Sequence, residues 1–231
     1  MTVDTIEAMS PILSKESGQI TKNRQRILCI GGAGYLGSRL VPELISMGHA
    51  VTVLDLFWFG DHLPYCQKLK MDAADLVESD LMNYDCVIWL AGLSNDPMAN
   101  FSPQENYTGN AATPALICYL AKQAGVKRFI HGGSCSVYGN ASDYDHDETS
   151  KPMATYPYGV AKLMAETGCQ QQADDNFSVI MLRKGTVSGW SPRQRFDLII
   201  NTMFKDAMSS RITVAAILKA IIANRNHSFH S

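Results

Sequence analysis

The sequence predicts an α/β protein built on a doubly wound parallel sheet. Short, continuous apolar runs alternate with segments of helical periodicity from about residue 26 to residue 208, an order typical of strands joined by helical crossovers. The runs are apolar throughout, as expected of strands that are buried on both faces. The chain has 231 residues, of which 46% are hydrophobic and 18% charged, enough for one substantial core.

The first predicted elements form a βαβ unit of about 30 residues. An apolar run predicts a strand at Arg26–Ile30, and a β-branched run predicts a second strand at 50–56. The segment between them has helical spacing of its apolar residues, and Gly48 ends it. Its periodic positions are Leu36, Leu40, Leu44 and Ile45.

The same alternation continues along the rest of the chain. Further strands are predicted at 68–71, 86–91, 127–132 and 177–183, and further helices at 104–124, 158–172 and 197–208. Residues 1–25 contain charged side chains and no sustained apolar run, so we expect a flexible arm there and no signal peptide.

Three glycines, Gly31, Gly34 and Gly37, follow the first predicted strand and open the helix. A phosphate needs backbone N–H groups at a helix N-terminus, and side chains there would block its approach. One glycine would make the turn, the next would admit a pyrophosphate, and the last would let the helix pack on the strand. The turn predicts a Rossmann-type dinucleotide site, with a tight turn without a ligand as the alternative.

Asp55 strengthens this prediction, because it ends the second strand 18 residues after Gly37. A carboxylate at that place accepts hydrogen bonds from ribose hydroxyls. It would repel a 2′-phosphate, and no arginine follows it closely, so NAD is expected rather than NADP. The alternative is a solvated carboxylate at a strand end.

Ser134, Tyr158 and Lys162 are the candidate catalytic residues. Tyr158 and Lys162 are four residues apart on a predicted helix and therefore share a face. An ammonium beside a phenol favours the phenolate, which can accept a proton from a hydroxyl while hydride leaves the same carbon. Ser134 follows the fifth predicted strand, at the edge where ligands bind in such sheets. The alternatives are an exposed helical pair and a serine that caps a strand.

The chain resembles the extended short-chain dehydrogenase/reductases, in the NAD-dependent epimerase/dehydratase group that acts on nucleotide sugars. The motifs that carry the resemblance lie in family order from about residue 26 to residue 190. They are GGAGYLG (31–37), VTVLDL (51–56), DAAD (72–75), VIWLAG (87–92), ENYTGN (105–110), GVKRFIHGGSCSVYG (125–139) and YPYGVAKLMAE (156–166).

The resemblance implies further roles at the matching positions. Asn106 would support the active site, Lys162 would also bind the nicotinamide ribose, and Ser134 would match the catalytic serine or threonine. The remaining cofactor contacts would come from Tyr35 and Leu36 in the turn, from Asp72 and Ala73 beside the adenine, and from Leu90, Ala91 and Gly92. Candidate substrate contacts are Ser94, Cys135, Ser136, Arg193 and Arg195.

The residues after Ser134 bear on the type of reaction. In 4,6-dehydratases of this family an Asp–Glu pair follows the hydroxyl residue, whereas Cys135 and Ser136 stand here, so we disfavour dehydration. Cys135 could be an acid or base, although a small buried residue is the favoured interpretation. We expect an epimerase or dehydrogenase that passes through a keto sugar. The alternatives are an NAD-binding homologue without catalysis and a dehydrogenase of a small hydroxy compound.

The resemblance weakens toward the C-terminus. We expect an NAD-binding domain at 26–190 and, at 191–231, a short remnant of the substrate-binding region with an atypical tail. Position 184 is a lysine, where the family commonly has an apolar or aromatic residue beside the nicotinamide.

Net charge, cysteine and histidine spacing, and hydropathy indicate which partners and which location to expect. The formal net charge is −2, which does not favour nucleic acid or an acidic membrane surface. The six cysteines form no C-x-x-C and the histidines have no metal-ligand spacing, so we expect neither a disulfide framework nor a metal site. No run approaches the roughly 20 apolar residues of a membrane span. We expect a cytoplasmic protein, and the resemblance implies a homodimer.

Overall fold

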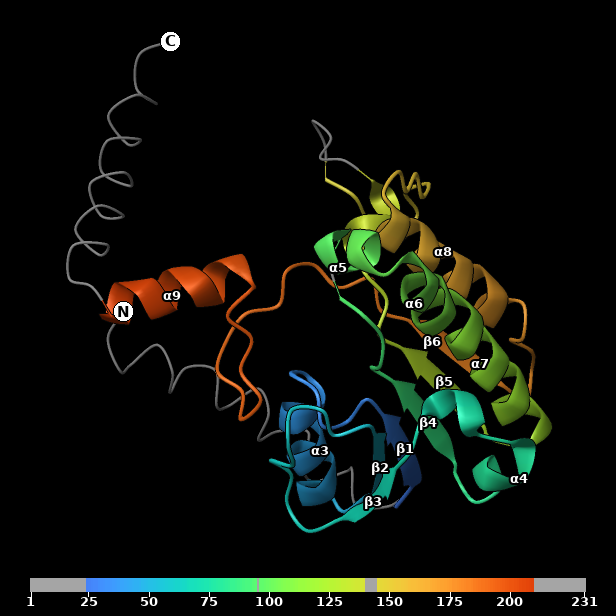
Figure 1. The fold of residues 1–231 in the computed structure, drawn as a ribbon. Coiled ribbons are helices and arrows are strands. Elements are labelled where there is room, and N and C mark those ends of the chain that lie inside the picture. The colour runs from blue at the N-terminus through green and yellow to red at the C-terminus, as the bar shows by residue number, and fades with distance from the viewer. Residues whose placement is uncertain (1–23, 95, 140–144, 210–231) are drawn as a thin grey trace. The chain divides into compact units, whose positions relative to one another are not determined.

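The computed structural model describes residues 24–94, 96–139 and 145–209. The chain divides into two units after Gly185, and we describe each by itself. The first unit contains a six-stranded parallel sheet with helices on both faces (Figure 1). This architecture confirms the predicted fold class. The expected arm lies almost entirely outside the described residues, as does the tail after residue 209.

The strand order is β3-β2-β1-β4-β5-β6, and all neighbouring strands are parallel. The order reverses between β1 and β4, and ligands of such sheets bind at the carboxyl edge near this reversal. The strands are β1 (Arg26–Ile30), β2 (Ala50–Asp55), β3 (Gln67–Lys70), β4 (Cys86–Trp89), β5 (Arg128–His131) and β6 (Ser178–Met181).

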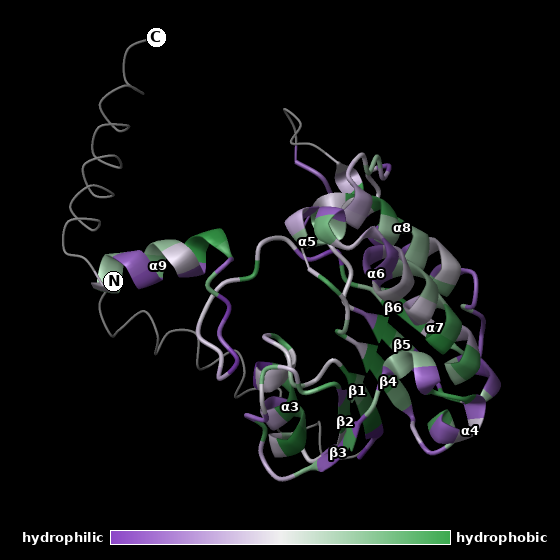
Figure 2. Cartoon of the chain, viewed as in Figure 1, coloured by the Kyte–Doolittle hydropathy of each residue, from purple (hydrophilic) through white to green (hydrophobic). Residues whose placement is uncertain are grey.

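Side chains of β1 alternate between two buried clusters, one on each face of the sheet. Ile27 and Cys29 belong to the cluster that the partly buried leucines of α3 (Gly37–Ser46) pack against. Leu28 and Ile30 belong to the cluster that includes Ile117 and Cys169 of the opposite face. A strand buried on both faces must be apolar at every position, and Figure 2 shows strongly hydrophobic strands between the helices.

Helices α4 (Glu78–Leu81), α7 (Thr113–Gln123) and α8 (Pro157–Gln170) supply or cover that opposite face. The structure does not form the single helix predicted at 104–124. It has α6 (Pro103–Tyr107), then a wider π-helical turn at Thr108–Ala112, then α7. Pro114 has no N–H to donate to a carbonyl one turn earlier, which favours such a break in the ladder.

Four short elements were not predicted, because three to six residues carry too little periodic pattern. They are α4, α5 (Asp96–Phe101) and 3₁₀ turns at Ala73–Asp75 and Cys135–Tyr138. The observed strands differ from the predicted ones mainly at their ends, where assignments shift by one or two residues.

The second unit includes α9 (Ile199–Ser209), which begins near the predicted start of the last helix. Asn201 is buried and joins this helix to the preceding loop, since it accepts a hydrogen bond from Gly189 N and donates one to Arg195 O. Within the described ranges, no helix is both long enough and apolar enough to span a bilayer.

Candidate functional site

The glycine turn is held against the ends of β2 and β4 by backbone contacts. Gly31 N donates to Leu54 O over 2.8 Å, and Gly31 has a φ of +79°. A Cβ atom at Gly31 would lie 2.4 Å from Ala91 N. Only glycine meets both requirements, the left-handed backbone and the close approach.

The other two glycines of the motif differ in what surrounds them. A Cβ at Gly37 would lie 2.3 Å from Gly32 O, so α3 can begin this close to the turn only with glycine at its first position. At Gly34 the nearest atom would be Gly31 O, 3.2 Å away. The turn thus leaves an open face at Gly34, before the N-terminus of α3, as a cradle for a diphosphate requires.

Asp55 is half-buried at the end of β2 and supports the turn. Its Oδ2 accepts a hydrogen bond from Ala33 N over 3.0 Å, and its Oδ1 accepts one from Phe57 N over 2.8 Å. Each carboxylate oxygen can accept more than one hydrogen bond, so Asp55 can also receive ribose hydroxyls. The cradle and this carboxylate lie on adjacent strands, and together they fit a dinucleotide.

The residues expected to line the remaining cofactor surface lie at the same carboxyl edge. Asp72 accepts from Ala74 N over 2.9 Å, and Ala73 is buried beside it. Leu90 N donates to Ile30 O over 2.8 Å, which ties the end of β4 to β1. The positions of Tyr35 and Leu36, in the turn, are also consistent with the prediction. Their contacts with a cofactor stay predictions.

Two buried asparagines connect the end of β4 to the start of α8. Asn106 Nδ2 donates to Pro157 O over 3.1 Å, next to Tyr158. Asn110 Nδ2 donates to Asn106 Oδ1 over 3.0 Å and to Leu93 O over 2.8 Å. Asn106 was predicted, whereas Asn110 was missed. Its signal was the pair of asparagines four residues apart in ENYTGN.

Asn110 also requires a glycine at position 92. Gly92 has a φ of +125°, and a Cβ there would lie 2.2 Å from Asn110 Oδ1. That amide oxygen is buried and has no hydrogen-bond partner among the described residues. The loop after β4 can therefore pass this close to the helix only at a glycine.

The three candidate catalytic residues come from two neighbouring elements. Ser134 has an extended backbone after β5, and its hydroxyl donates to Ser136 Oγ over 3.0 Å. Lys162 is only 4% exposed, and its Nζ lies 5.7 Å from the centre of the Tyr158 ring. Burial, together with the nearby Lys184, lowers the pKa of Lys162 to about 7. The amine therefore lies beside the tyrosine in the folded unit and carries its proton mainly below pH 7.

Two further basic residues lie near Lys162. They are Lys184, whose position the family resemblance puts beside the nicotinamide, and His131, which was not predicted. His131, at the end of β5, is fully buried, and neither ring nitrogen has a hydrogen-bond partner among the described residues. Burial and the two lysines lower the pKa of His131 to about 2, so the imidazole is neutral. Lys184 is half-buried, and a Cβ at Gly132 would lie 2.6 Å from its Nζ.

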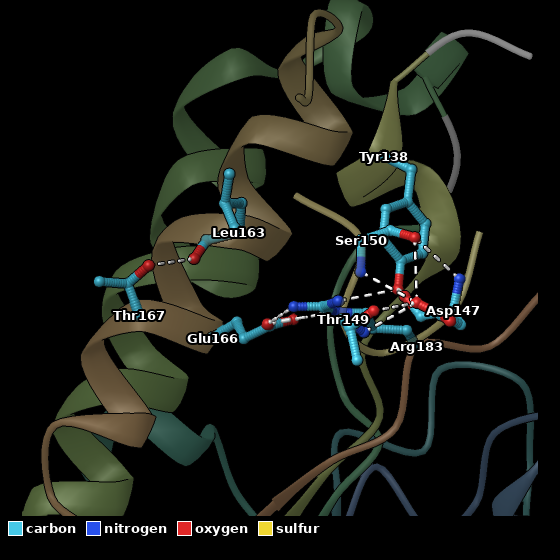
Figure 3. Close-up of polar contacts among 8 residues, drawn as sticks. All are labelled: Tyr138, Asp147, Thr149, Ser150, Leu163, Glu166, Thr167 and Arg183. Carbon is cyan, nitrogen blue, oxygen red and sulfur yellow. Dashed lines mark hydrogen bonds and ion pairs between the residues drawn. The ribbon is translucent and has the colours of Figure 1, made fainter. Parts of the chain in front are cut away.

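A separate polar network joins the end of β6 to α8 (Figure 3). The Arg183 guanidinium forms an ion pair with buried Glu166, and its Nη1 donates to Tyr138 Oη over 2.8 Å. Tyr138 Oη in turn donates to Asp147 O over 2.5 Å. The network borders a cavity of about 630 Å³, which is also lined by Cys135, Gly139, His146, Glu148, Gln170, Met181 and Leu182.

The expectation that Cys135 is a small buried residue is wrong, because its side chain is exposed at the border of this cavity. The 3₁₀ turn that follows Ser134 directs residue 135 outward, whereas Val137 is buried. Ser136 contacts Ser134, and Ser94 is half-buried beyond β4.

The two candidate arginines lie in the second unit. Arg193 Nη1 donates to Gln194 O over 2.9 Å, and Arg195 forms an ion pair with Asp197. Their contacts with a substrate stay predictions. Among the described residues, no group of three His, Cys, Asp or Glu side chains could hold a metal ion.

These features define a class of protein. A doubly wound sheet with a glycine cradle at β1 and a carboxylate at β2 is the arrangement of a Rossmann-type dinucleotide-binding protein, and the candidate residues Ser134, Tyr158 and Lys162 follow β5 in the chain. Residues 27–221 match the model of the NAD-dependent epimerase/dehydratase family, and the chain belongs to that family. The family resemblance is thereby confirmed, and the expected cofactor, NAD, is confirmed as that of the family.

Curated relatives include several UDP-glucose 4-epimerases. The protein of Erwinia amylovora is 33% identical over 175 residues, which cover 68% of this chain and 52% of the relative. UDP-glucose 4-epimerase 3 of Oryza sativa subsp. japonica is 30% identical, with 74% of this chain and 53% of the relative covered. The chain therefore spans about half the length of the curated relatives it matches.

Solved structures show the same fold. MoeE5, in complex with UDP-glucuronic acid and NAD, has a TM-score of 0.70 and 32% identity, with 78% of this chain and 60% of that chain covered. The UDP-glucuronic acid 4-epimerase of Bacillus cereus, in complex with NAD, has a TM-score of 0.68 and 25% identity, with 80% and 63% covered.

Proposed function

We propose that this chain binds NAD across the carboxyl edge of its sheet and takes part in hydride transfer to and from a nucleotide sugar. The observation that carries the proposal is the burial of Lys162 beside the Tyr158 ring, within the same unit as the glycine cradle. UDP-sugars are the first substrates to consider, because the relatives and structural neighbours carry UDP-sugar names.

The chemistry assigned to Tyr158 is proton transfer. The ammonium of Lys162 stabilises a phenolate at Tyr158 Oη, which then accepts the proton of a sugar hydroxyl. Ser134 Oγ donates a hydrogen bond to the same sugar oxygen and holds it toward Tyr158. Bound NAD would supply the acceptor for the hydride on the carbon that carries this oxygen. Asn106 fixes the start of α8 through Pro157 O and so sets the position of Tyr158.

The product depends on the fate of the keto sugar after oxidation. Return of hydride to the opposite face of the sugar gives an epimerase, and release of the ketone gives a dehydrogenase. A 4,6-dehydratase is disfavoured, because neither Cys135 nor Ser136 matches the Asp–Glu pair that such an enzyme uses for elimination. The homodimer stays a prediction.

The replacement Tyr158→Phe tests the mechanism directly. It should lower turnover of UDP-glucose by about 10²–10⁴-fold, the usual contribution of a positioned acid or base, and leave the affinity for NAD nearly unchanged. Turnover is measured by chromatography of the sugar products and by the absorbance of reduced cofactor. Unchanged turnover in the variant would rule out this role for Tyr158.

A second candidate function is NAD binding without catalysis. The observation that favours it is the pKa of Lys162, lowered to about 7, which leaves part of the population without the cation that the mechanism requires. It predicts that NAD raises the melting temperature of the protein, while UDP-glucose, UDP-glucuronic acid and UDP-N-acetylglucosamine give no keto sugar and no cofactor reduction. Detection of either product excludes it. A dehydrogenase of a small hydroxy compound would instead show no thermal shift with any of these sugars.

A further inference from the structure

Lys184 extends from the end of β6 over the neighbouring strand. Its backbone pairs with Ser134, and its Nζ lies so close above Gly132 that a Cβ there would be 2.6 Å from it. The same Cβ position is 3.0 Å from Trp89 O, at the end of β4. The ammonium therefore lies at the carboxyl end of β5, on the side near the end of β4, and the absence of a side chain at Gly132 makes room for it.

No carboxylate accompanies this charge in the part of the chain that the structure describes. Neither Lys184 nor Lys162 has an ion pair there, and the buried acid on the same helix as Lys162, Glu166, is paired with Arg183. The third basic group, His131, is uncharged near neutral pH. Two cations thus share one edge of the sheet without a counter-ion from the described chain.

The strand order indicates which part of a bound dinucleotide would face them. Asp55 marks the ribose end at β2, and Gly31 marks the diphosphate at β1. The next strands in the sheet are β4 and β5. A dinucleotide that continues in this direction would place its nicotinamide half over the carboxyl ends of β4 and β5. The Lys184 ammonium and Ser134 both lie at this end of β5.

We infer that Lys184 places a second positive charge beside the nicotinamide and thereby makes the protein bind NADH more tightly than NAD⁺. The inference rests on the proposed function. The oxidised nicotinamide ring carries a positive charge and the reduced ring carries none, so nearby ammonium groups repel only the oxidised form. Because Lys162 is buried and Lys184 is half-buried, the repulsion is larger than it would be at an exposed site.

The preference has a consequence for the reaction. A site that favours NADH over NAD⁺ holds the hydride more firmly, which shifts the bound equilibrium toward the keto sugar. Lys184 would change the relative affinity for the two cofactor forms through the charge of the nicotinamide ring. It would take no proton from the substrate.

The test compares the two dissociation constants in the full chain and in Lys184→Met. NADH binding is followed by its fluorescence, and NAD⁺ binding by displacement of NADH, below pH 7 where the Lys162 ammonium keeps its proton. The ratio of the NAD⁺ constant to the NADH constant should fall about tenfold in Lys184→Met. Lys184→Arg, which keeps the charge, should retain most of the ratio and controls for folding.

Lys127→Met is the matched control. It removes the same charge from the opposite end of β5, where Lys127 is exposed, and should leave the ratio unchanged. An unchanged ratio in Lys184→Met would overturn the inference, and so would an equal loss of both affinities, since that would place Lys184 on a part shared by both cofactor forms. If the unaltered protein bound neither form, the proposed function would fail as well.

Discussion

The residues at the carboxyl edge of the sheet are positioned by different interactions in its two halves. At β1 and β2, the turn is positioned by backbone hydrogen bonds, by glycines in contact with neighbouring backbone, and by Asp55. At β5 and β6, the corresponding positions are set by side chains, which include the ion pair of Arg183 with Glu166, the buried Lys162 and the half-buried Lys184.

The difference matches what each half would do. Binding a diphosphate requires shape and N–H groups, which the backbone supplies whatever the surrounding side chains. Moving a proton requires a group whose pKa is close to the working pH, and burial near other charges provides this. The cradle is thus predictable from local sequence, whereas the reactive half depends on which distant side chains meet.

The largest expected effect comes from removing the ion pair at the β5–β6 half of the sheet. Arg183→Met leaves the Glu166 carboxylate, whose side chain is 4% exposed, without its cation, and should lower the free energy of unfolding by about 3–5 kcal/mol. Urea unfolding followed by circular dichroism measures this. Arg26→Met is the matched control, because its ion pair with Asp85 is largely exposed and its loss should cost far less than that of the buried pair. Equal losses would show that burial does not distinguish the pairs.

The next largest effect comes from replacing glycines of the cradle. Gly31→Ala introduces a Cβ 2.4 Å from Ala91 N at a residue with a φ of +79°, and should lower the free energy of unfolding by about 2–4 kcal/mol. Gly34→Ala meets only Gly31 O, 3.2 Å away, and should cost less than about 1 kcal/mol while it weakens NAD binding. Urea unfolding gives both stabilities, and their reversal would contradict the division of roles between these glycines.

The smallest expected effect is the pH dependence of stability that the buried Lys162 causes. Lys162 has its pKa lowered from 10.5 to about 7, so above pH 7 the unfolded chain binds more protons than the folded chain. Stability of the cofactor-free protein should therefore rise with pH, by about 1–2 kcal/mol between pH 7 and 9. The window ends at 9 because burial raises the pKa of the Cys29 and Cys86 thiols above that value, which acts in the opposite direction.

Lys162→Met should remove most of this rise, and Lys127→Met should keep it. Urea unfolding of the three proteins at several pH values provides the comparison. A rise of equal size in Lys162→Met would mean that other groups cause it, with Lys184 the first to consider, since burial lowers its pKa as well.

The fold was predictable from the sequence wherever a signal was local. A buried parallel strand must be apolar at each position, so β1, β2 and β4 were predicted with small errors at their ends. The helix predicted at 104–124 was a partial failure. Its periodicity is that of one helix, but Pro114 and the packing of Asn110 against Gly92 accompany a wider turn.

The sequence by itself determined the cradle, because the spacing of Gly31, Gly34 and Gly37 after an apolar strand is a local pattern, and it determined Asp55 through its place at a strand end. It also determined the spacing of Tyr158 and Lys162, which one helix fixes. Only the tertiary structure decided the charges around them. Lys184, His131 and Lys162 are far apart in the chain, and the repulsion between the two lysines and the burial of all three groups arise only when β5, β6 and α8 pack together.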